Sequence, residues 1–147
     1  MKAILTVGIS GSGKTTWAEK QQGFTIISRD DIRREIIEKD LNHKLEPNSN
    51  LFHYWDFKKE CEVNKIQSKL FKQLADEKRN IIVADTNISI KTRNSLTKTL
   101  QNLGYTVELK IFDISLADAI ERDSKRPNKV GASVITQQFN NIRNQGL

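Results

Sequence analysis

The sequence predicts an α/β protein in which a four-stranded, mostly parallel sheet is flanked by helices on both faces. Three observations lead to this prediction: short apolar runs recur along the chain, helical patterns lie between them, and a glycine-rich loop follows the first run. Strands that alternate with helices over short connections form sheets of this kind. The chain has 147 residues and no Gly/Ser-rich linker, so we expect a single domain over residues 1–147.

Four segments have the character of strands. Residues 2–7, 24–28 and 80–85 are short apolar runs, which are typical of strands buried inside a parallel sheet. Residues 105–112 instead alternate between apolar and polar side chains, and this pattern favours a peripheral strand.

Helical patterns fill the intervals between these runs. Ser28 and Asp31 have the spacing of a capping box, which predicts that a helix begins there. Apolar side chains at steps of three and four residues mark the others. These helices are expected over about residues 52–77, through Leu96 to a stop at Gly104, from Ser115 to just before Pro127, and through Ile135, Phe139 and Ile142.

Composition excludes several classes of protein. With 37% apolar and 29% charged residues, and no apolar run of about 18 residues, the chain is globular and has no predicted membrane span or membrane partner. One cysteine and two histidines allow neither an internal disulfide nor a zinc site. We therefore expect an intracellular, cytoplasmic protein.

The charge distribution is uneven. The net charge is +6, and residues 122–147 carry Arg122, Lys125, Arg126, Lys129 and Arg143 against Asp123 alone. Such an excess suits a nucleotide phosphate or a polyanion. Taken by itself, however, it is more simply interpreted as a solvated basic face.

The strongest motif is a complete phosphate loop, Gly8-Ile9-Ser10-Gly11-Ser12-Gly13-Lys14-Thr15, followed by Thr16. It follows a predicted strand and opens a predicted helix, which is the context that the motif requires. Its backbone N–H groups and the helix N-terminus bind phosphate oxygens. Lys14 is expected to bridge the β- and γ-phosphates of ATP or another NTP, and the Thr15 hydroxyl to hold Mg²⁺. The motif predicts a nucleotide site.

An acidic and basic cluster follows the second predicted strand. A carboxylate at Asp30 can accept the proton of an attacking hydroxyl, and Arg33, one helical turn on, can hold an anionic acceptor. The simpler interpretation is that Asp30 and Asp31 complement the helix dipole. Together with the phosphate loop, the cluster favours a role in the reaction.

The third predicted strand ends in Asp85-Thr86-Asn87. An aspartate after an apolar strand is typical of the acidic partner of a phosphate loop, near a metal or an acceptor. The same three residues also favour an Asx-type turn that merely ends the strand. Both interpretations stay open.

Arg122 and Arg126 are four residues apart, which would place them on one face of a helix. Two such arginines can close over a triphosphate as a lid and stabilise the charge of phosphoryl transfer. The alternative is a solvated basic helix end that the helix dipole stabilises.

These four segments, taken in order, read GISGSGKTTW, SRDDIR, VADTN and ERDSKR. The ordered set resembles the phage polynucleotide 5′-kinase family, in particular the kinase half of the phage bifunctional 5′-kinase/3′-phosphatase. The resemblance covers nearly the whole chain. It implies a P-loop kinase domain that transfers the γ-phosphoryl group of ATP to the 5′-hydroxyl end of DNA or RNA, with Mg²⁺, and it leaves a homo-oligomer open.

The resemblance also implies roles for individual residues. Lys14, Asp30 and Arg126 match the family's catalytic lysine, general base and lid arginine, and Arg122 joins Arg126 over the nucleotide. Arg33 matches the arginine that holds an acceptor phosphate. Asp85, Thr86 and Asn87 match a motif that lines the acceptor side.

Two other functions remain open from the sequence. One is a P-loop kinase that acts on a hydroxyl of a nucleoside, sugar or antibiotic. The other is a nucleotide-binding switch or toxin-like protein without acceptor turnover. The chain has no D-x-D pair of the aspartyl-phosphatase type, so we expect no 3′-phosphatase activity.

Overall fold

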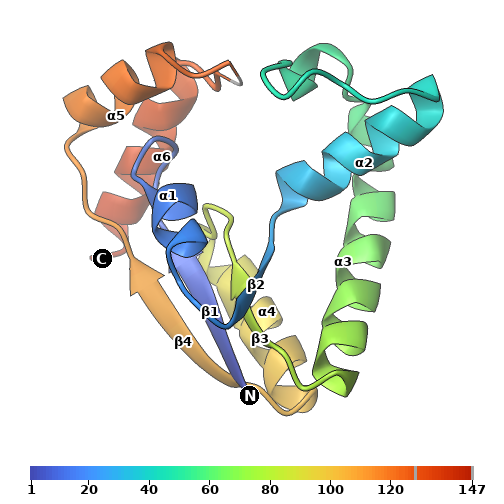
Figure 1. Cartoon of the computed structure of the whole chain (residues 1–147). Coiled ribbons are helices and arrows are strands. Elements are labelled where there is room, and N and C mark those ends of the chain that lie inside the picture. Colours follow the sequence, from blue (N-terminus) through green and yellow to red (C-terminus); the bar gives the residue numbers. More distant parts are fainter. Residues whose placement is uncertain (128, 147) are drawn as a thin grey trace.

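A computed structural model describes residues 1–127 and 129–146; Asn128 and Leu147, which belong to the basic stretch 122–147 considered above, lie outside the described residues. Within this part of the chain, one sheet contains four strands in the order β2-β3-β1-β4 (Figure 1). The strands are β1 (Lys2–Val7), β2 (Phe24–Ile27), β3 (Asn80–Val83) and β4 (Thr106–Ile111). All three pairings are parallel, so the predicted fold class is confirmed, and β4 is a peripheral strand as expected.

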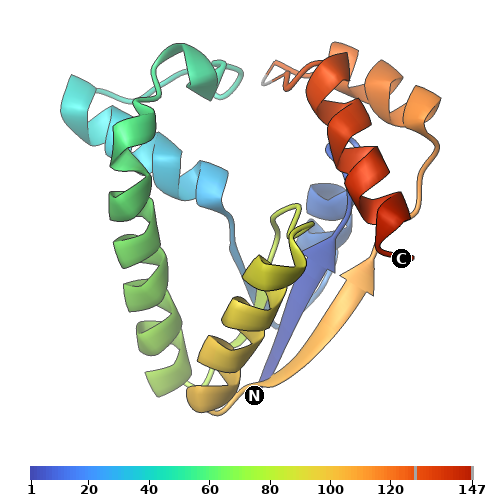
Figure 2. The same cartoon turned by 180° about the vertical axis from the view of Figure 1, so that it is seen from behind.

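Helices cover both faces of the sheet. Figures 1 and 2, which are opposite views, show α1 in front of one face and α4 in front of the other. The helices are α1 (Lys14–Glu19), α2 (Arg29–Leu41), α3 (Glu60–Asp76), α4 (Ile90–Asn102), α5 (Leu116–Ser124) and α6 (Ala132–Asn144). The predicted caps of α2 and α5 form, because Ser28 accepts from the Asp31 N–H at 3.4 Å and Ser115 from the Asp118 N–H at 3.1 Å. No helix in residues 1–127 and 129–146 has the length and apolarity needed to cross a bilayer.

Two helix predictions were wrong in detail. The long helix expected over about 52–77 begins only at Glu60, because residues before it form two 3₁₀ turns, η1 (Leu51–His53) and η2 (Phe57–Lys59). The side chains of Asn50 and Asp56 cap the starts of these turns, where they accept from the N–H groups of Phe52 and Lys58. Arg126 does not share a helical face with Arg122, since α5 ends at Ser124 and Arg126 lies in the following turn.

The core has two parts. The larger one packs one face of β1 and β3, including Leu5 and Val83, against α3 and α4. The smaller one joins four buried side chains from the phosphate loop, the loop after β3, α5 and α6: Ile9, Ile88, Ala119 and Ile135. This second cluster fixes the loops at the carboxyl edge of the sheet relative to α5 and α6.

Candidate active site

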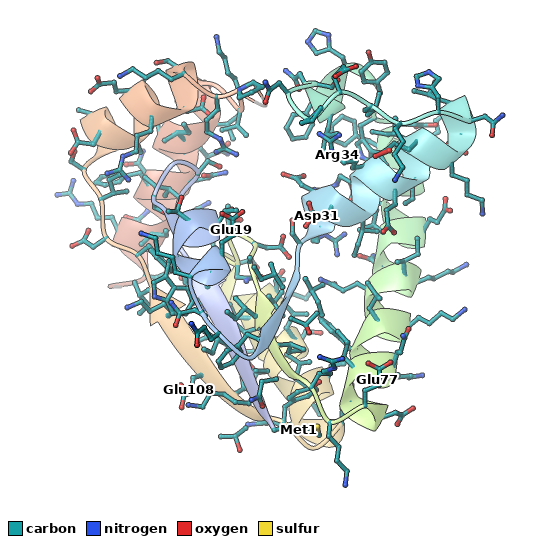
Figure 3. All side chains as sticks on the ribbon, in the orientation of Figure 1. Met1, Glu19, Asp31, Arg34, Glu77 and Glu108 are labelled. Atoms are coloured by element: carbon teal, nitrogen blue, oxygen red, sulfur yellow. The ribbon has the colours of Figure 1, made fainter. Side chains whose placement is uncertain are left out.

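The predicted site residues gather at the carboxyl edge of the sheet. The phosphate loop follows β1, Asp30 lies in the first turn of α2 after β2, and Asp85 lies just past β3 (Figure 1). Figure 3 shows Glu19 of α1 and Asp31 of α2 on opposite sides of this edge. Burial, with smaller effects from the charges of Asp30 and Glu19, raises the pKa of Asp31. The charges of Glu19 on α1 and Asp31 on α2 therefore interact across this edge of the sheet.

The phosphate loop has the backbone that its glycines predict. Gly13 has φ 94° and begins α1 without any side-chain cap, so the first N–H groups of α1 are left for an anion. The Lys14 Nζ is buried and donates to the carbonyl oxygens of Gly8 at 3.0 Å and Ile9 at 2.7 Å. Burial, and next the positive charge of Arg126, lower the pKa of Lys14 to about 8. A bound phosphate would replace these carbonyls as the partner of the ammonium.

Helix α5 packs directly on the phosphate loop. A Cβ built at Gly11 would lie 2.8 Å from the carbonyl oxygen of Ala119, so only glycine permits this approach. Arg122 Nη1 donates to the Gly11 carbonyl oxygen at 3.2 Å. Both predicted lid arginines are thus beside the loop, Arg122 by contact and Arg126 through its charge on Lys14.

The turn after α5 is held by Asp123, which sequence analysis did not single out. Its carboxylate is 2% exposed and accepts from the N–H groups of Val130 and Gly131, each at 3.0 Å. This pairing holds Val130 and Gly131, just before α6, against the last turn of α5. Buried carboxylates are retained where such paired backbone donors satisfy them.

Asp85 connects the two halves of the edge. Its Oδ1 accepts from the backbone N–H of Arg29 at 2.9 Å, while Oδ2 is buried without a hydrogen-bond partner in the described residues. Burial raises the pKa of Asp85 to about 6, against the opposing hydrogen bond from Arg29. Asp85 also acts electrostatically on Lys14, so the acid after β3 faces the phosphate-loop lysine.

Thr86 and Asn87 hold the loop after β3. The Asn87 amide is buried and donates to the Thr6 carbonyl oxygen at 2.9 Å, and Asn87 adopts φ 47°. The Thr86 carbonyl oxygen accepts from the Gly8 N–H at 3.1 Å. Buried Arg93 donates to the carbonyl oxygens of Asn87 and Ile88 at 3.0 and 2.6 Å. The turn interpretation of Thr86 and Asn87 is therefore supported, although both also line the cavity described below together with Asp85.

Arg33 and Asp30 form a pair that Glu60 of α3 supports. Arg33 Nη1 donates to Asp30 Oδ1 at 2.7 Å, and Arg33 Nε to Glu60 Oε1 at 2.9 Å. Arg29 and Trp55 also donate to Glu60, at 3.0 and 2.9 Å. The hydrogen bond from Arg33, helped by the other two, lowers the pKa of Glu60 to about 2 despite partial burial.

Sequence reasoning missed Glu60, Arg29 and Trp55. Nothing in the local pattern marks Glu60, since an acid in the first turn of a helix is ordinary. It also missed Gln138 of α6, whose Oε1 accepts from the Ser10 N–H of the phosphate loop at 2.9 Å. Gln138 lines a cavity of about 580 Å³ together with Arg29, Asp85, Thr86 and residues at the start of α4.

The residues present fit a magnesium ion that is shared with nucleotide phosphates. In the described residues no three acidic, histidine or cysteine side chains converge as a complete metal cage. Mg²⁺ bound with a nucleotide does not need one, because it takes most of its ligands from phosphates and water. Thr15 is exposed in the first turn of α1, and Asp85 Oδ2 is unpartnered across from Lys14.

A phosphate loop, an acid after β3 and a basic element from α5 at one edge of a parallel sheet define a P-loop kinase fold. A family model described as an AAA domain matches residues 4–145, and the chain belongs to this family.

Comparisons with known proteins support the predicted resemblance to polynucleotide kinases. An inferred bifunctional polynucleotide kinase/RNA ligase of Autographa californica nuclear polyhedrosis virus is 32% identical over 126 residues, which are 86% of this chain and 18% of that protein. The Pnkp1/Rnl/Hen1 RNA repair complex contains a chain that matches with a TM-score of 0.75 at 20% identity, over 99% of this chain and 45% of that one. A gluconokinase from Sinorhizobium meliloti 1021 matches with a TM-score of 0.59 at 16% identity, over 96% of this chain and 74% of that one.

These matches confirm the recognised family and the fold. This chain spans under half of the RNA repair chain and about a fifth of the viral relative. The gluconokinase shows that the same fold also occurs in a protein named for a small-molecule substrate.

Proposed function

We propose that residues 1–147 form a single polynucleotide 5′-hydroxyl kinase domain that uses ATP and Mg²⁺ and acts in nucleic-acid end repair. The observation that carries this proposal is the Asp30–Arg33 pair, which is joined at 2.7 Å at the start of α2, at the same carboxyl edge of the sheet as the phosphate loop. It offers an acceptor hydroxyl both a proton acceptor and a cation for a neighbouring phosphate. The viral relative named for polynucleotide kinase and RNA ligase activities supports the choice of a nucleic-acid acceptor.

In this proposal Asp30 removes the proton of the 5′-hydroxyl. The alkoxide oxygen attacks the γ-phosphorus of ATP in line, the new P–O bond forms as the bond to the β-phosphate oxygen breaks, and ADP leaves. Lys14 and Arg126 stabilise the negative charge on the transferring group and on the leaving diphosphate. Mg²⁺, when bound, neutralises phosphate charge, with Thr15 as its protein-side hydroxyl.

Arg33 is suited to hold the phosphate next to the reacting end. A guanidinium has five N–H donors, and the contacts to Asp30 Oδ1, Glu60 Oε1 and Glu60 Oε2 use three of them. The remaining two N–H donors are available to a phosphate of the acceptor, because Arg33 lies within the site and is partly exposed. A fixed arginine is well suited to phosphate recognition.

The reaction is tested by transfer of labelled γ-phosphate from ATP, with Mg²⁺, to a short 5′-hydroxyl oligonucleotide, with the 5′-phosphorylated strand as control. We expect label on the 5′-hydroxyl strand alone. Binding of ATP without any transfer to DNA or RNA would contradict the proposal. Transfer to a nucleoside or sugar instead would identify a small-molecule kinase.

The base and the lid arginine are tested by Asp30→Ala and Arg126→Ala. Loss of a general base costs about 10²- to 10⁴-fold in kcat, and loss of a transition-state arginine about 10³-fold or more. Asp31→Asn and Arg143→Ala are the controls. Asp31 is exposed and lies next to Asp30 on α2, and Arg143 is an exposed arginine in the last turn of α6. Wild-type kcat in either site variant would remove that residue's role.

A further inference from the structure

Three aromatic side chains are exposed on the segment between α2 and α3. Phe52, Tyr54 and Phe57 are 37%, 51% and 69% exposed, respectively. Large aromatic side chains usually supply buried area, and neighbouring exposed ones mark a binding surface. We call these three residues the aromatic rim.

The local structure presents the rim in a fixed orientation. Leu51 and Trp55 of the same segment are 4% and 7% exposed and belong to the main core. Their burial turns the side chains between and beyond them outward. Caps from Asn50 and Asp56, each with a hydrogen bond of 3.0 Å, fix the two 3₁₀ turns. A surface of this kind binds without first having to be ordered.

The rim is joined to the proposed acceptor site. Trp55, in the middle of the segment, donates to Glu60 at 2.9 Å, and Glu60 in turn holds Arg33. The Arg33 guanidinium also lies 5.8 Å from the centre of the Trp55 ring. Figures 1 and 2 show the segment above the carboxyl end of the sheet, on the side of α2 and α3.

The charges around the rim favour an anionic partner. Lys58 is exposed on the same segment, and Lys129 is exposed after α5. The one acid between the rim residues, Asp56, accepts the hydrogen bond that caps the second 3₁₀ turn. Flat apolar rings interleaved with cations match a single-stranded nucleic acid, whose bases stack on aromatic rings while its backbone contacts lysines. An apolar protein partner would not require this positive charge.

We propose that the aromatic rim is a stacking surface for bases of a single-stranded DNA or RNA whose 5′ end lies at Asp30 and Arg33. The inference rests on the proposed function for the identity of the strand, and it adds where the bases beyond the reacting end are bound. Stacking is independent of sequence, because every base has a flat face.

The test is fluorescence anisotropy with a dye-labelled single-stranded oligodeoxyadenylate of about 12 nucleotides, a length within the usual range of such surfaces. An abasic strand of the same length and charge is the second probe. Each stacked base contributes enough that the double variant Tyr54→Ala/Phe57→Ala should weaken binding of the adenylate by about 10-fold or more. Binding of the abasic strand should change little.

Substitutions within and outside the rim separate stacking from general apolarity. Phe57→Trp should keep the affinity, whereas Phe57→Leu should lose it although it stays apolar. Leu109→Ala is the control, because Leu109 is 48% exposed on the edge strand β4, away from the site. Unchanged thermal unfolding of these surface variants checks that each one folds.

Unchanged binding of the adenylate by the double variant would overturn the inference, as would a wild-type protein that binds neither strand. Equal loss for adenylate and abasic strands would also overturn it, since the bases would then play no part. Rim-dependent binding without phosphoryl transfer would support the inference and contradict the proposed kinase. Phosphoryl transfer together with binding that does not depend on the rim would support the proposed kinase and overturn the inference.

Discussion

Glu60 is the residue on which the acceptor side depends. It accepts hydrogen bonds from Arg33 and Arg29 of α2 and from Trp55 of the segment between α2 and α3. Charge-assisted hydrogen bonds of this type restrict an arginine to one orientation. Glu60 therefore positions Arg33 without facing the reacting atoms in its own right.

Glu60→Gln is expected to raise the KM for the nucleic acid several-fold while kcat falls little. The neutral amide gives up one acceptor oxygen and the charge that pairs with Arg33, so the arginine becomes less fixed. The free energy of unfolding should fall by only about 1 kcal/mol, because the pair is partly exposed. Glu62→Gln is the control on the same first turn of α3. A large fall in kcat with unchanged KM would contradict this positioning role.

Asp85 makes the protein less stable as the pH rises, which is the opposite of the usual effect of an ion-paired carboxylate. Its pKa in the folded chain is raised from 3.8 to about 6, so the folded state binds this proton more tightly than the unfolded state does. The contribution of Asp85 to the free energy of unfolding is most favourable below pH 3.8 and is lost as the pH rises to about 6.

Asp85→Asn should therefore stabilise the protein near neutral pH, by an amount on the order of 3 kcal/mol. Urea unfolding of both proteins across this pH range measures the effect. The difference between variant and wild type should grow from pH 3.8 to about 6 and then level off. A difference that does not vary with pH would show that the Asp85 carboxyl is not perturbed.

At the scale of elements, the decisive contact is that between α5 and the phosphate loop. The backbones of Gly11 and Ala119 approach so closely that a single methyl group would separate them. This contact brings Arg122 to the loop. Ile9 of the loop and Ala119 of α5 are buried in the second core cluster and hold the two elements together.

Gly11→Ala should weaken ATP binding by about tenfold or more, because strain adds to the displacement of α5. Gly23→Ala is a matched control: Gly23 has φ +78°, close to the +81° of Gly11, but a Cβ there meets nothing within 4 Å. It should lose about 1 kcal/mol of stability from backbone strain alone and keep its affinity for ATP. Equal losses of affinity in both variants would contradict the contact argument. Isothermal titration calorimetry measures both.

At the scale of the whole molecule, the two tryptophans lie on different sides of the site. Trp17 of α1 follows the phosphate loop and packs edge-on against Phe112, with ring centres 5.7 Å apart. Trp55 contacts Glu60 and Arg33 on the α2–α3 side. We therefore expect each one to respond to a different ligand.

The Trp55→Phe variant, which keeps Trp17, should change fluorescence when ATP is added. The Trp17→Phe variant, which keeps Trp55, should respond mainly to an oligonucleotide. Titration of each single-tryptophan protein with both ligands gives the measurement. The opposite pattern would show that the nucleotide and acceptor sides have been assigned the wrong way round.

The sequence determined those features that depend on neighbours along the chain. The phosphate loop, the caps at Ser28 and Ser115, and the apolar runs of β1 and β3 are local patterns, and hydrogen bonding and burial enforce them locally. For the same reason the succession of strands and helices along the chain, and with it the fold class, could be predicted from the sequence. Helix α3 was predicted to begin several residues too early, because the residues before Glu60 form two 3₁₀ turns whose starts are capped by Asn50 and Asp56.

Contacts between residues far apart in the sequence could be found only from the tertiary structure. Arg33 and Glu60 are 27 residues apart, and Ser10 and Gln138 are 128 apart, with no pattern in the sequence that links either pair. The raised pKa of Asp85 likewise comes from burial that several elements create together. Motifs thus located the phosphate loop and the acid–arginine pair, whereas packing placed the side chains that orient them, because contact across elements depends on the fold as a whole.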